Sequence, residues 1–475
     1  RLLGARIAAD GQWRFPYQPE VPEKFVQAIV EFEDERFFWH PGVDILAIGR
    51  ALEQNIRNGE IVSGGSTITM QVIRLARQLP RRTLWQKIIE AIWATRLEIR
   101  LSKSEILAHY AAHAPFGGNV VGLEAASWRY FGKSPDLLSW SEAATLAVLP
   151  NAPALIHPGR NRQALLEKRN RLLQRLHEKG LLDATDLDLA KAEPLPGQPL
   201  ALPRLAPHLL DRAYLEHLAG KKTQRTRIRT TVDAQVQQSV NQILQRHQSL
   251  LRNNDIHNAA ALVLDVETGE AIAYAGNVLA AGATHQNQVD VIPAPRSTGS
   301  ILKPFLYAAM LQEGQLVAQS KISDIPMQLS GYRPENFHED YDGIVSAEQA
   351  IVRSLNVPLV RMLQDYGLEK FHYKLQQLGL STINRPAAHY GLPLVLGGAE
   401  ATLWDLTGAY ASMSRTLKHF YDYNGQYKSN DFRAATYLYQ KAKVTTPVLQ
   451  KQASVFNAAA IWLAFQAMQE VQRPN

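Results

Sequence analysis

Two stretches decide the fold of this 475-residue chain: Glu33-Asp34-Glu35-Arg36-Phe37-Phe38-Trp39-His40 near its start and Ser300-Ile301-Leu302-Lys303 past its middle. The first places carboxylates beside three aromatic rings, a setting in which burial tunes a carboxyl group for proton transfer. The second places a serine hydroxyl one helical turn from a lysine amine that can act as its base. The two chemistries are unrelated, so we expect two active sites on two domains.

The composition is that of a folded protein with more than one domain. A chain of 475 residues, 46% of them hydrophobic and 20% charged, is larger than one ordinary core serves. It contains no cysteine, which excludes disulfides, thiolate metal sites and a cysteine nucleophile. No run approaches the ~18 apolar residues that cross a bilayer. Since the chain begins at Arg1 without a methionine, we expect its N-terminal membrane anchor to be missing.

Basic residues are concentrated in one part of the chain, whose net charge is +7. Between residues 74 and 103 only Glu90 and Glu98 are acidic, and the basic residues there are Arg74, Arg77, Arg81, Arg82, Lys87, Arg96, Arg100 and Lys103. Two interpretations stay open: a solvated helical face, or attraction to a polyanion such as a phosphorylated substrate or an anionic lipid surface. We expect no nucleic-acid partner, since no motif of that kind occurs.

Helix signals fill residues 22–180. Pro22 suits a first helical position, and helices are expected to stop at Gly59 and Gly180. Capping-box patterns precede three apolar runs, at Thr83, Ser102 and Ser139. We therefore expect an all-helical domain over residues 1–190.

A linker and a mixed α/β domain are expected to follow. Five prolines between residues 193 and 207 indicate a linker region, which we place at 191–255. Two β-like runs flank the turn Glu267-Thr268-Gly269-Glu270 and predict a hairpin. Helical patterns return at 300–313, 346–366 and 400–415. The second domain is therefore placed at residues 256–475.

The residues around the first stretch leave two interpretations open. Glu33 is either a shielded acid or base, or a solvent-exposed helix residue. The run Gly64-Gly65-Ser66-Thr67-Ile68-Thr69-Met70-Gln71 either binds pyrophosphate at a helix start or is an ordinary capped turn. Lys87 and Glu90 share a helix face, as a surface ion pair or as a pyrophosphate and metal site.

In this order and spacing, the motifs resemble the family 51 peptidoglycan glycosyltransferases. The matching positions are Glu33-Asp34-x-x-Phe37-x-x-His40-x-Gly42, Gly65-Ser66-Thr67-x-Thr69-x-Gln71 and Lys87-x-x-Glu90. The resemblance implies a lysozyme-like helical domain that polymerises lipid II.

The resemblance also implies the role of each residue. Glu33 is the base that takes a proton from the 4-hydroxyl of the acceptor sugar, and polyprenyl pyrophosphate leaves with inversion. Glu90 is the second catalytic carboxylate and the ligand of a divalent cation, Mg or Mn. The residues implied to bind substrate are Asp34, Ser66, Gln71, Arg74 and Lys87.

The second stretch is a Ser-x-x-Lys motif at an expected helix start. Pro304 fits only near the beginning of a helix, so Ser300 and Lys303 share its first turn. There the helix dipole lowers the pKa of Lys303, and the neutral amine can take the serine proton. The alternative is an N-capping serine beside a solvated lysine.

A Ser-x-Asn motif follows at Ser354-Leu355-Asn356. Ser-x-x-Lys, Ser-x-Asn and Lys-Thr-Gly form the set used by penicillin-binding proteins and β-lactamases. The second domain therefore resembles a penicillin-binding serine transpeptidase: Ser300 is acylated, Lys303 is its base, and Ser354 and Asn356 assist. No Lys-Thr-Gly occurs, and Lys443-Val444-Thr445-Thr446 does not replace it. We expect the C-terminal part of this domain to lie beyond the chain.

Together the two resemblances indicate a class A bifunctional penicillin-binding protein. The stretches 114–119, 331–337 and 390–392 with 396–400 resemble the 1C branch of that class. The class implies lipid II, the growing glycan strand, stem peptides and β-lactams at Ser300 as partners, with no cofactor for the transpeptidase. It also implies the bacterial inner membrane, with the catalytic domains in the periplasm. The alternatives are a lysozyme-like lytic enzyme and a β-lactam-binding sensor or scaffold with little turnover.

Overall fold

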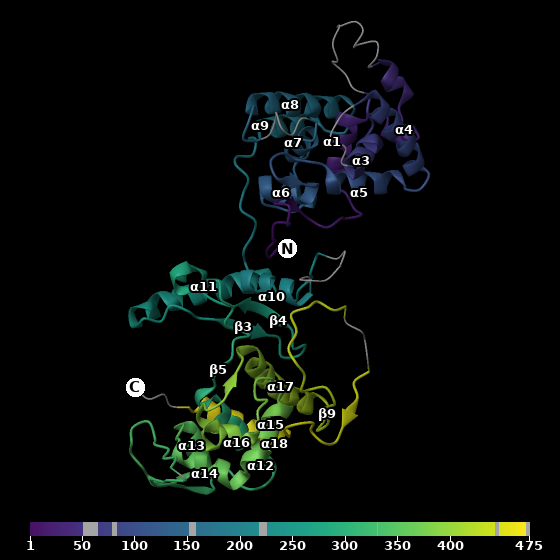
Figure 1. Ribbon diagram of the computed structural model, residues 1–475. Helices are drawn as coiled ribbons and strands as arrows, with labels where there is room; N and C mark the ends of the chain where they lie inside the picture. The colour runs from purple at the N-terminus through teal and green to yellow at the C-terminus, as the bar shows by residue number, and fades with distance from the viewer. Residues whose placement is uncertain are drawn as a thin grey trace. The chain divides into compact units, whose positions relative to one another are not determined.

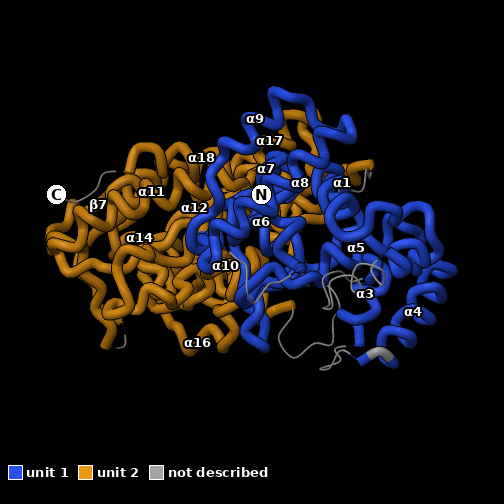
Figure 2. Tube along the Cα trace, turned by 90° about the horizontal axis from the view of Figure 1, so that it is seen from above, with its two compact units in different colours: residues 1–204, 218–227 blue, residues 205–217, 228–475 orange. Residues whose placement is uncertain are grey.

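The computed structural model describes residues 1–50, 65–77, 83–151, 158–217, 226–329, 331–441 and 446–471. They form two compact units, coloured separately in Figure 2. Unit 1 consists of residues 1–204 and 218–227, and unit 2 of residues 205–217 and 228–475. The boundary after residue 204 falls inside the proline-rich stretch.

Unit 1 is helical, as expected (Figure 1). Its helices are α1 (Glu23–Glu33), α3 (Ile68–Arg77), α4 (Leu84–Glu98), α5 (Lys103–His113), α6 (Leu123–Phe131), α7 (Trp140–Val148), α8 (Arg162–Glu178) and α9 (Ala184–Ala192), with short 3-10 turns at Phe37–Trp39 and Pro135–Leu137. Two-residue strands β1 (Trp13–Arg14) and β2 (Val120–Val121) add one parallel pair, which the sequence did not predict.

The helix α7 forms the centre of unit 1 and packs against α1 and α8. Small side chains, Ala143, Ala144 and Ala147, let the neighbouring helices approach closely, and all three are fully buried. Removal of this apolar surface from water is the main stabilising term for such a bundle.

The expected helix ends in unit 1 are confirmed where the structure describes them. Ser102 and Ser139 form complete capping boxes, and the Thr83 hydroxyl accepts from the Gln86 N–H. Gly180 has φ of 73° just after α8, the left-handed conformation that ends a helix. Pro22 precedes α1 as its N-cap instead of occupying the first helical position. Gly59 lies outside the described residues.

Unit 2 mixes helices with short strands, as expected. Its helices are α10 (Pro207–His217), α11 (Ala234–Leu251), α12 (Lys303–Gln312), α13 (Ala347–Val352), α14 (Val357–Tyr366), α15 (Leu368–Gln377), α16 (Ala387–Tyr390), α17 (Leu403–Asp422) and α18 (Ala458–Gln469). Its strands are β3 (Ala261–Leu264), β4 (Ala271–Ala275), β5 (Arg296–Ser297), β6 (Lys321–Asp324), β7 (Gly343–Ser346), β8 (Glu400–Ala401), β9 (Tyr427–Lys428) and β10 (Leu449–Gln450). Its 3-10 turns are Arg252–Asn254, Leu279–Ala281, Ala283–His285, Gly299–Leu302 and Leu392–Leu396.

The predicted hairpin is confirmed as the antiparallel pair β3–β4. It lies between α10 and α11 on one side and α17 on the other (Figure 1). The two helices α10 and α11 stand within residues 191–255, which we had expected to be a linker region. The core of the unit surrounds α12, whose residues from Lys303 to Met310 are all buried.

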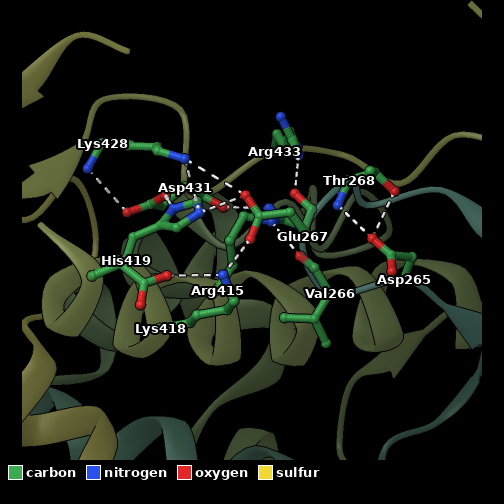
Figure 3. Close-up of polar contacts among 11 residues, drawn as sticks. Asp265, Val266, Glu267, Thr268, Arg415, Lys418, His419, Lys428, Asp431 and Arg433 are labelled. Carbon is green, nitrogen blue, oxygen red and sulfur yellow. Dashed lines mark hydrogen bonds and ion pairs between the residues drawn. The ribbon is translucent and has the colours of Figure 1, made fainter. Parts of the chain in front are cut away.

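A polar cluster fixes the hairpin turn to α17 (Figure 3). The ring of His419, on α17, lies between two carboxylates, with Nδ1 2.5 Å from Asp431 Oδ1 and Nε2 2.9 Å from Glu267 Oε1. Buried Arg415, also on α17, donates to the carbonyl oxygen of Val266. The cluster therefore satisfies the backbone of the turn as well as its charges.

We expect the cluster to contribute to stability in a pH-dependent way. Desolvation alone would raise the pKa of Glu267, but the bonds from His419 and Lys418 outweigh it and hold the pKa at about 2. A carboxyl with a lowered folded-state pKa stabilises the fold above its unfolded pKa, and this contribution is lost as the pH falls through the folded pKa.

Replacing Glu267 by Gln should therefore lower the free energy of unfolding of unit 2 at pH 7, by on the order of 1 kcal/mol because the carboxylate is partly screened by solvent. The difference from the wild type should shrink as the pH falls from about 4.5 toward about 2. Denaturant unfolding at several pH values measures this. A constant difference across that range would contradict the ion-pair explanation.

Candidate active sites

The first candidate site centres on Glu33, the last residue of α1. Its Oε2 accepts a hydrogen bond of 2.7 Å from Gln71 Nε2 on α3. Its Oε1 is buried and has no hydrogen-bond partner among the described residues. Desolvation raises the pKa of Glu33, and the neighbouring Gln71, Asn151, Lys168 and Arg74 oppose this rise only in part. Such a carboxylate has a free lone pair and raised basicity, as a general base requires.

Asp34 connects the segments that form this site. Its carboxylate lies 2.9 Å from His40 Nε2 and accepts the backbone N–H of Ile68 at 3.0 Å. Ile68 is the first residue of α3, so this bond links the end of α1 to the start of the helix that carries Gln71. Asp34 is buried, and its geometry favours a positioning role over direct contact with substrate.

Gly42 contacts both the segment before α3 and the helix α4. Its carbonyl oxygen accepts from the Thr67 hydroxyl at 2.6 Å. Its φ is +91°, and a Cβ built there would lie 2.7 Å from the backbone of Ala94. Only glycine fits this position, which explains its place in the motif.

Arg74 and Glu90 form the second group of the first site. The guanidinium makes two bonds to the carboxylate, Nε to Oε1 at 3.1 Å and Nη2 to Oε2 at 3.0 Å. Its Nη2 also lies 3.3 Å from Ser66 Oγ. Glu90 is thus paired with Arg74 on α3, whereas Lys87 is exposed on α4. One of the two open interpretations was a surface ion pair between Lys87 and Glu90. Glu90 forms its ion pair with Arg74 instead.

The described residues do not form a protein-held cation site. No cluster of three or more His, Cys, Asp or Glu side chains in them is placed to bind a metal ion. A cation at Glu90 would have to displace the Arg74 guanidinium, which neutralises both oxygens of the carboxylate. A divalent cation shared between one carboxylate and a substrate pyrophosphate needs no such cluster, so the expected cation stays a prediction, and we assign it no chemical step.

The sequence missed three residues beside Glu33. Asn151 and Lys168 lower its pKa, and Lys168 Nζ lies 3.3 Å from Asn151 Oδ1. The Tyr110 hydroxyl is buried without a hydrogen-bond partner among the described residues, and burial together with the charge of Glu33 raises its pKa. These side chains come from α8, a turn and α5, far apart in the chain, so no local spacing identifies them.

The second candidate site lies in unit 2, at the start of α12. Ser300 is exposed in the 3-10 turn that precedes the helix, and Lys303 is its first residue, with Pro304 next. This confirms the expected helix start. Lys303 is only 2% exposed, and desolvation lowers the pKa of its amine to about 7.

The Ser-x-Asn motif surrounds the Lys303 amine. Its Nζ donates to Asn356 Oδ1 and to the carbonyl oxygen of Ser354, both at 2.7 Å, and lies 3.2 Å from Ser354 Oγ. Among the described residues it makes no hydrogen bond to Ser300. Ser354 has φ of 50°, a strained conformation for a non-glycine residue of the kind found at active sites. The solvated-lysine alternative is therefore excluded.

Comparison with known proteins supports both halves. A transglycosylase family model matches residues 5–177, and a penicillin-binding protein transpeptidase domain model matches residues 259–475. The chain is 38% identical over 408 residues to penicillin-binding protein 1C of Escherichia coli (strain K12), covering 86% of this chain and 52% of that protein. It is 30% identical over 395 residues to penicillin-binding protein 1A of Streptococcus oralis, covering 78% and 60%. The chain thus spans little more than half the length of these relatives.

The buried amine predicts a specific pH dependence of stability. The pKa of Lys303 falls from 10.5 in the unfolded chain to about 7 in the folded one, so between these values the unfolded chain binds more protons. The free energy of unfolding should therefore rise from pH 7 to about 10.5, by at most about 1.4 kcal/mol per pH unit.

Replacing Lys303 by Met should remove this rise, and replacing the exposed Lys321 of the same unit by Met should leave it in place. Denaturant unfolding of the three proteins between pH 6 and about 10 measures the difference. Parallel profiles for the wild type and Lys303→Met would show that the amine is not desolvated.

Proposed function

Because the chain belongs to the class A penicillin-binding proteins, and is similar within them to the 1C protein, we propose that it synthesises peptidoglycan. Unit 1 polymerises lipid II into glycan strands, and unit 2 forms an acyl-enzyme with stem peptides for cross-linking, or with β-lactams. The observation that supports the proposal is a buried ionisable group beside predicted site residues in each unit, Glu33 bonded to Gln71 in unit 1 and Lys303 bonded to Asn356 in unit 2.

In unit 1, ionised Glu33 accepts the proton of the acceptor sugar's 4-hydroxyl. The hydroxyl oxygen then bonds to the anomeric carbon of the donor, the bond from that carbon to the pyrophosphate oxygen breaks, and the configuration inverts. The raised pKa makes Glu33 a stronger base than an exposed glutamate.

The leaving pyrophosphate needs positive charge, which this chain supplies through side chains. Arg74 is held by Glu90 beside Ser66, and exposed Lys87 extends from the next helix. A guanidinium fixed by a carboxylate needs no reorganisation when the charge develops, which is how preorganised groups stabilise a transition state.

In unit 2, neutral Lys303 takes the proton of Ser300 as its oxygen bonds to the carbonyl carbon of the stem peptide or the β-lactam. The carbon–nitrogen bond of the substrate then breaks, and the leaving nitrogen receives a proton through the Ser354 hydroxyl, which lies beside the same amine. A pKa of about 7 lets the amine serve as a base near neutral pH.

Separate sites on separate units predict separable activities. Replacing Glu33 by Gln keeps the bond pattern to Gln71 but removes the base, so lipid II polymerisation should fall by at least about 100-fold. Labelling of Ser300 by a fluorescent penicillin should be unchanged. Gel analysis of glycan products from labelled lipid II measures the first effect, and in-gel fluorescence measures the second.

Two outcomes would contradict this proposal for unit 1. If Glu33→Gln still polymerises lipid II, the base assignment is wrong. If the wild type cleaves preformed glycan and makes no polymer from lipid II, the lytic alternative replaces it.

We further propose that unit 1 contacts the bacterial inner membrane from the periplasmic side, where lipid II is held. None of the described helices combines the length and the apolar character needed to cross a membrane. However, α4 exposes Trp85, Ile88 and Ile92 at helical spacing, and Ile99 follows as its C-cap; each is more than half exposed. Basic Lys87 and Arg96 are exposed on the same helix, and exposed Arg100 comes just after it. Exposed apolar and basic residues on one helix are typical of a surface that inserts shallowly into anionic lipid.

Replacing Ile88 and Ile92 together by Ser should weaken binding to phosphatidylglycerol-containing vesicles by about 10-fold or more, because two partly inserted side chains are lost. The matched control is Leu189→Ser, which removes an equally exposed apolar residue from α9. Co-sedimentation with the vesicles measures binding. Equal binding by the two variants would contradict the assignment of α4 to the membrane.

A further inference from the structure

The helix α14 begins in an unusual way. Asn356 is its N-cap, and asparagine side chains commonly accept the free N–H groups of the first turn. Here the Asn356 side chain makes no such bond. Its Oδ1 accepts from the Lys303 amine at 2.7 Å, and its Nδ2 donates to the carbonyl oxygen of Glu335 at 2.8 Å.

Asn336, from a different loop, caps the helix instead. Its Oδ1 accepts the backbone N–H of Asn356 at 3.0 Å and that of Val357 at 3.2 Å. The neighbouring residues Glu335 and Asn336 thus hold Asn356 by its side chain and by its backbone. Asn336 is 3% exposed, so its own bonds to the start of α14 are largely shielded from water.

The orientation of Asn336 is itself fixed by a buried carboxylate. Its Nδ2 donates to Asp324 Oδ1 at 2.9 Å and to the carbonyl oxygen of Asp340 at 3.0 Å. The second oxygen of Asp324 accepts the N–H of Asp342 at 3.1 Å. Since Asp324 is only 1% exposed and can only accept, it forces the Nδ2 of Asn336 toward itself and the Oδ1 toward α14.

We propose that Asn336, oriented by Asp324, is a positioning residue for the acylation of Ser300. It accepts the backbone N–H groups of Asn356 and Val357 and so fixes the place from which the Asn356 side chain holds the Lys303 amine. This inference rests on the proposed role of Ser300 and Lys303 in unit 2.

The chain of bonds explains why the arrangement depends on Asn336. With Nδ2 of Asn356 held by Glu335, its Oδ1 must face the amine, whereas a flipped amide would present two N–H groups to a cation. Without Asn336, the N–H groups of Asn356 and Val357 lose their acceptor, so the start of α14 can shift and carry the Asn356 side chain away from Lys303.

The test is the rate at which a fluorescent penicillin acylates Ser300 in the full-length protein, measured from pH 5 to 9. The Asn336→Ala variant should react roughly 10- to 100-fold more slowly, because the base is misplaced. In the plot of acylation rate against pH, the rise on the acid side (the acid limb) should also move to higher pH. A loosened site admits water, so the pKa of Lys303 rises from about 7 toward 10.5.

The matched control is Asn277→Ala. Asn277 is a buried asparagine of the same unit that accepts the Val278 N–H at 2.8 Å and donates to the Val289 carbonyl oxygen at 3.1 Å. Its loss removes two side-chain hydrogen bonds, against four for Asn336, so it should lower thermal stability in the same direction but by less. It should leave the acylation rate and the acid limb where the wild type has them.

A reciprocal exchange keeps the test decisive if Asn336→Ala does not fold. Asn336→Asp retains the acceptor for α14 but places a second carboxylate against Asp324, so acylation should slow. Adding Asp324→Asn again gives one amide and one carboxylate, but the amide at position 324 now donates to the carboxylate at position 336. This double variant should recover part of the lost acylation rate.

The outcomes separate this inference from the proposed function. If penicillin does not label Ser300 in the wild type, the proposed function of unit 2 fails, and the inference fails with it. If the wild type is labelled but a folded Asn336→Ala variant reacts with the same rate and acid limb, the positioning role alone is refuted. Absence of recovery in the double variant would likewise refute the role of Asp324.

Discussion

The removal of the Lys303 amine from water is the constraint on which the site in unit 2 depends. A buried ammonium is costly, so the protein lowers its pKa and surrounds it with acceptors. These acceptors come from Ser354 and Asn356, and their placement needs a left-handed serine and a helix start capped from elsewhere. The left-handed Ser354 and the bonds from the start of α14 to Asn336 thus hold the groups that surround this buried amine.

The same physical principle acts in unit 1 with the opposite sign. Burial disfavours the charged form of any group, so it raises the pKa of the Glu33 carboxyl while it lowers that of the Lys303 amine. Burial thus makes the ionised Glu33 carboxylate a stronger base and leaves part of the Lys303 amine unprotonated near neutral pH, so each group can accept a proton. Two unrelated folds reach a usable base by the same means.

The sequence predicted whatever depends on local spacing. The capping boxes at Ser102 and Ser139, the β3–β4 hairpin and the proline near the start of α12 are each determined within a few residues, and the structure confirms them. The partner of Glu90 was not predictable in this way, because Arg74 stands on another helix, and spacing along α4 favoured Lys87 instead. Asn336 and Tyr110 were missed for the same reason, since tertiary packing brings them to their sites.

The distribution of positive charge shows how tertiary pairing changes the interpretation of a basic run. Arg74 is paired with Glu90 and Lys103 with Glu98, and Arg81 and Arg82 lie outside the described residues. The basic residues left exposed on α4 or directly after it are Lys87, Arg96 and Arg100, and exposed apolar residues of the same helix lie among them. Exposed tryptophan and isoleucine beside these basic residues support the proposed contact with an anionic lipid surface more than a purely polar, solvated face. In the proposed function, Arg74, which Glu90 holds in the site, faces the pyrophosphate, and the exposed basic residues of α4 face the lipid. One basic run of sequence would then bind both a phosphate and a lipid surface.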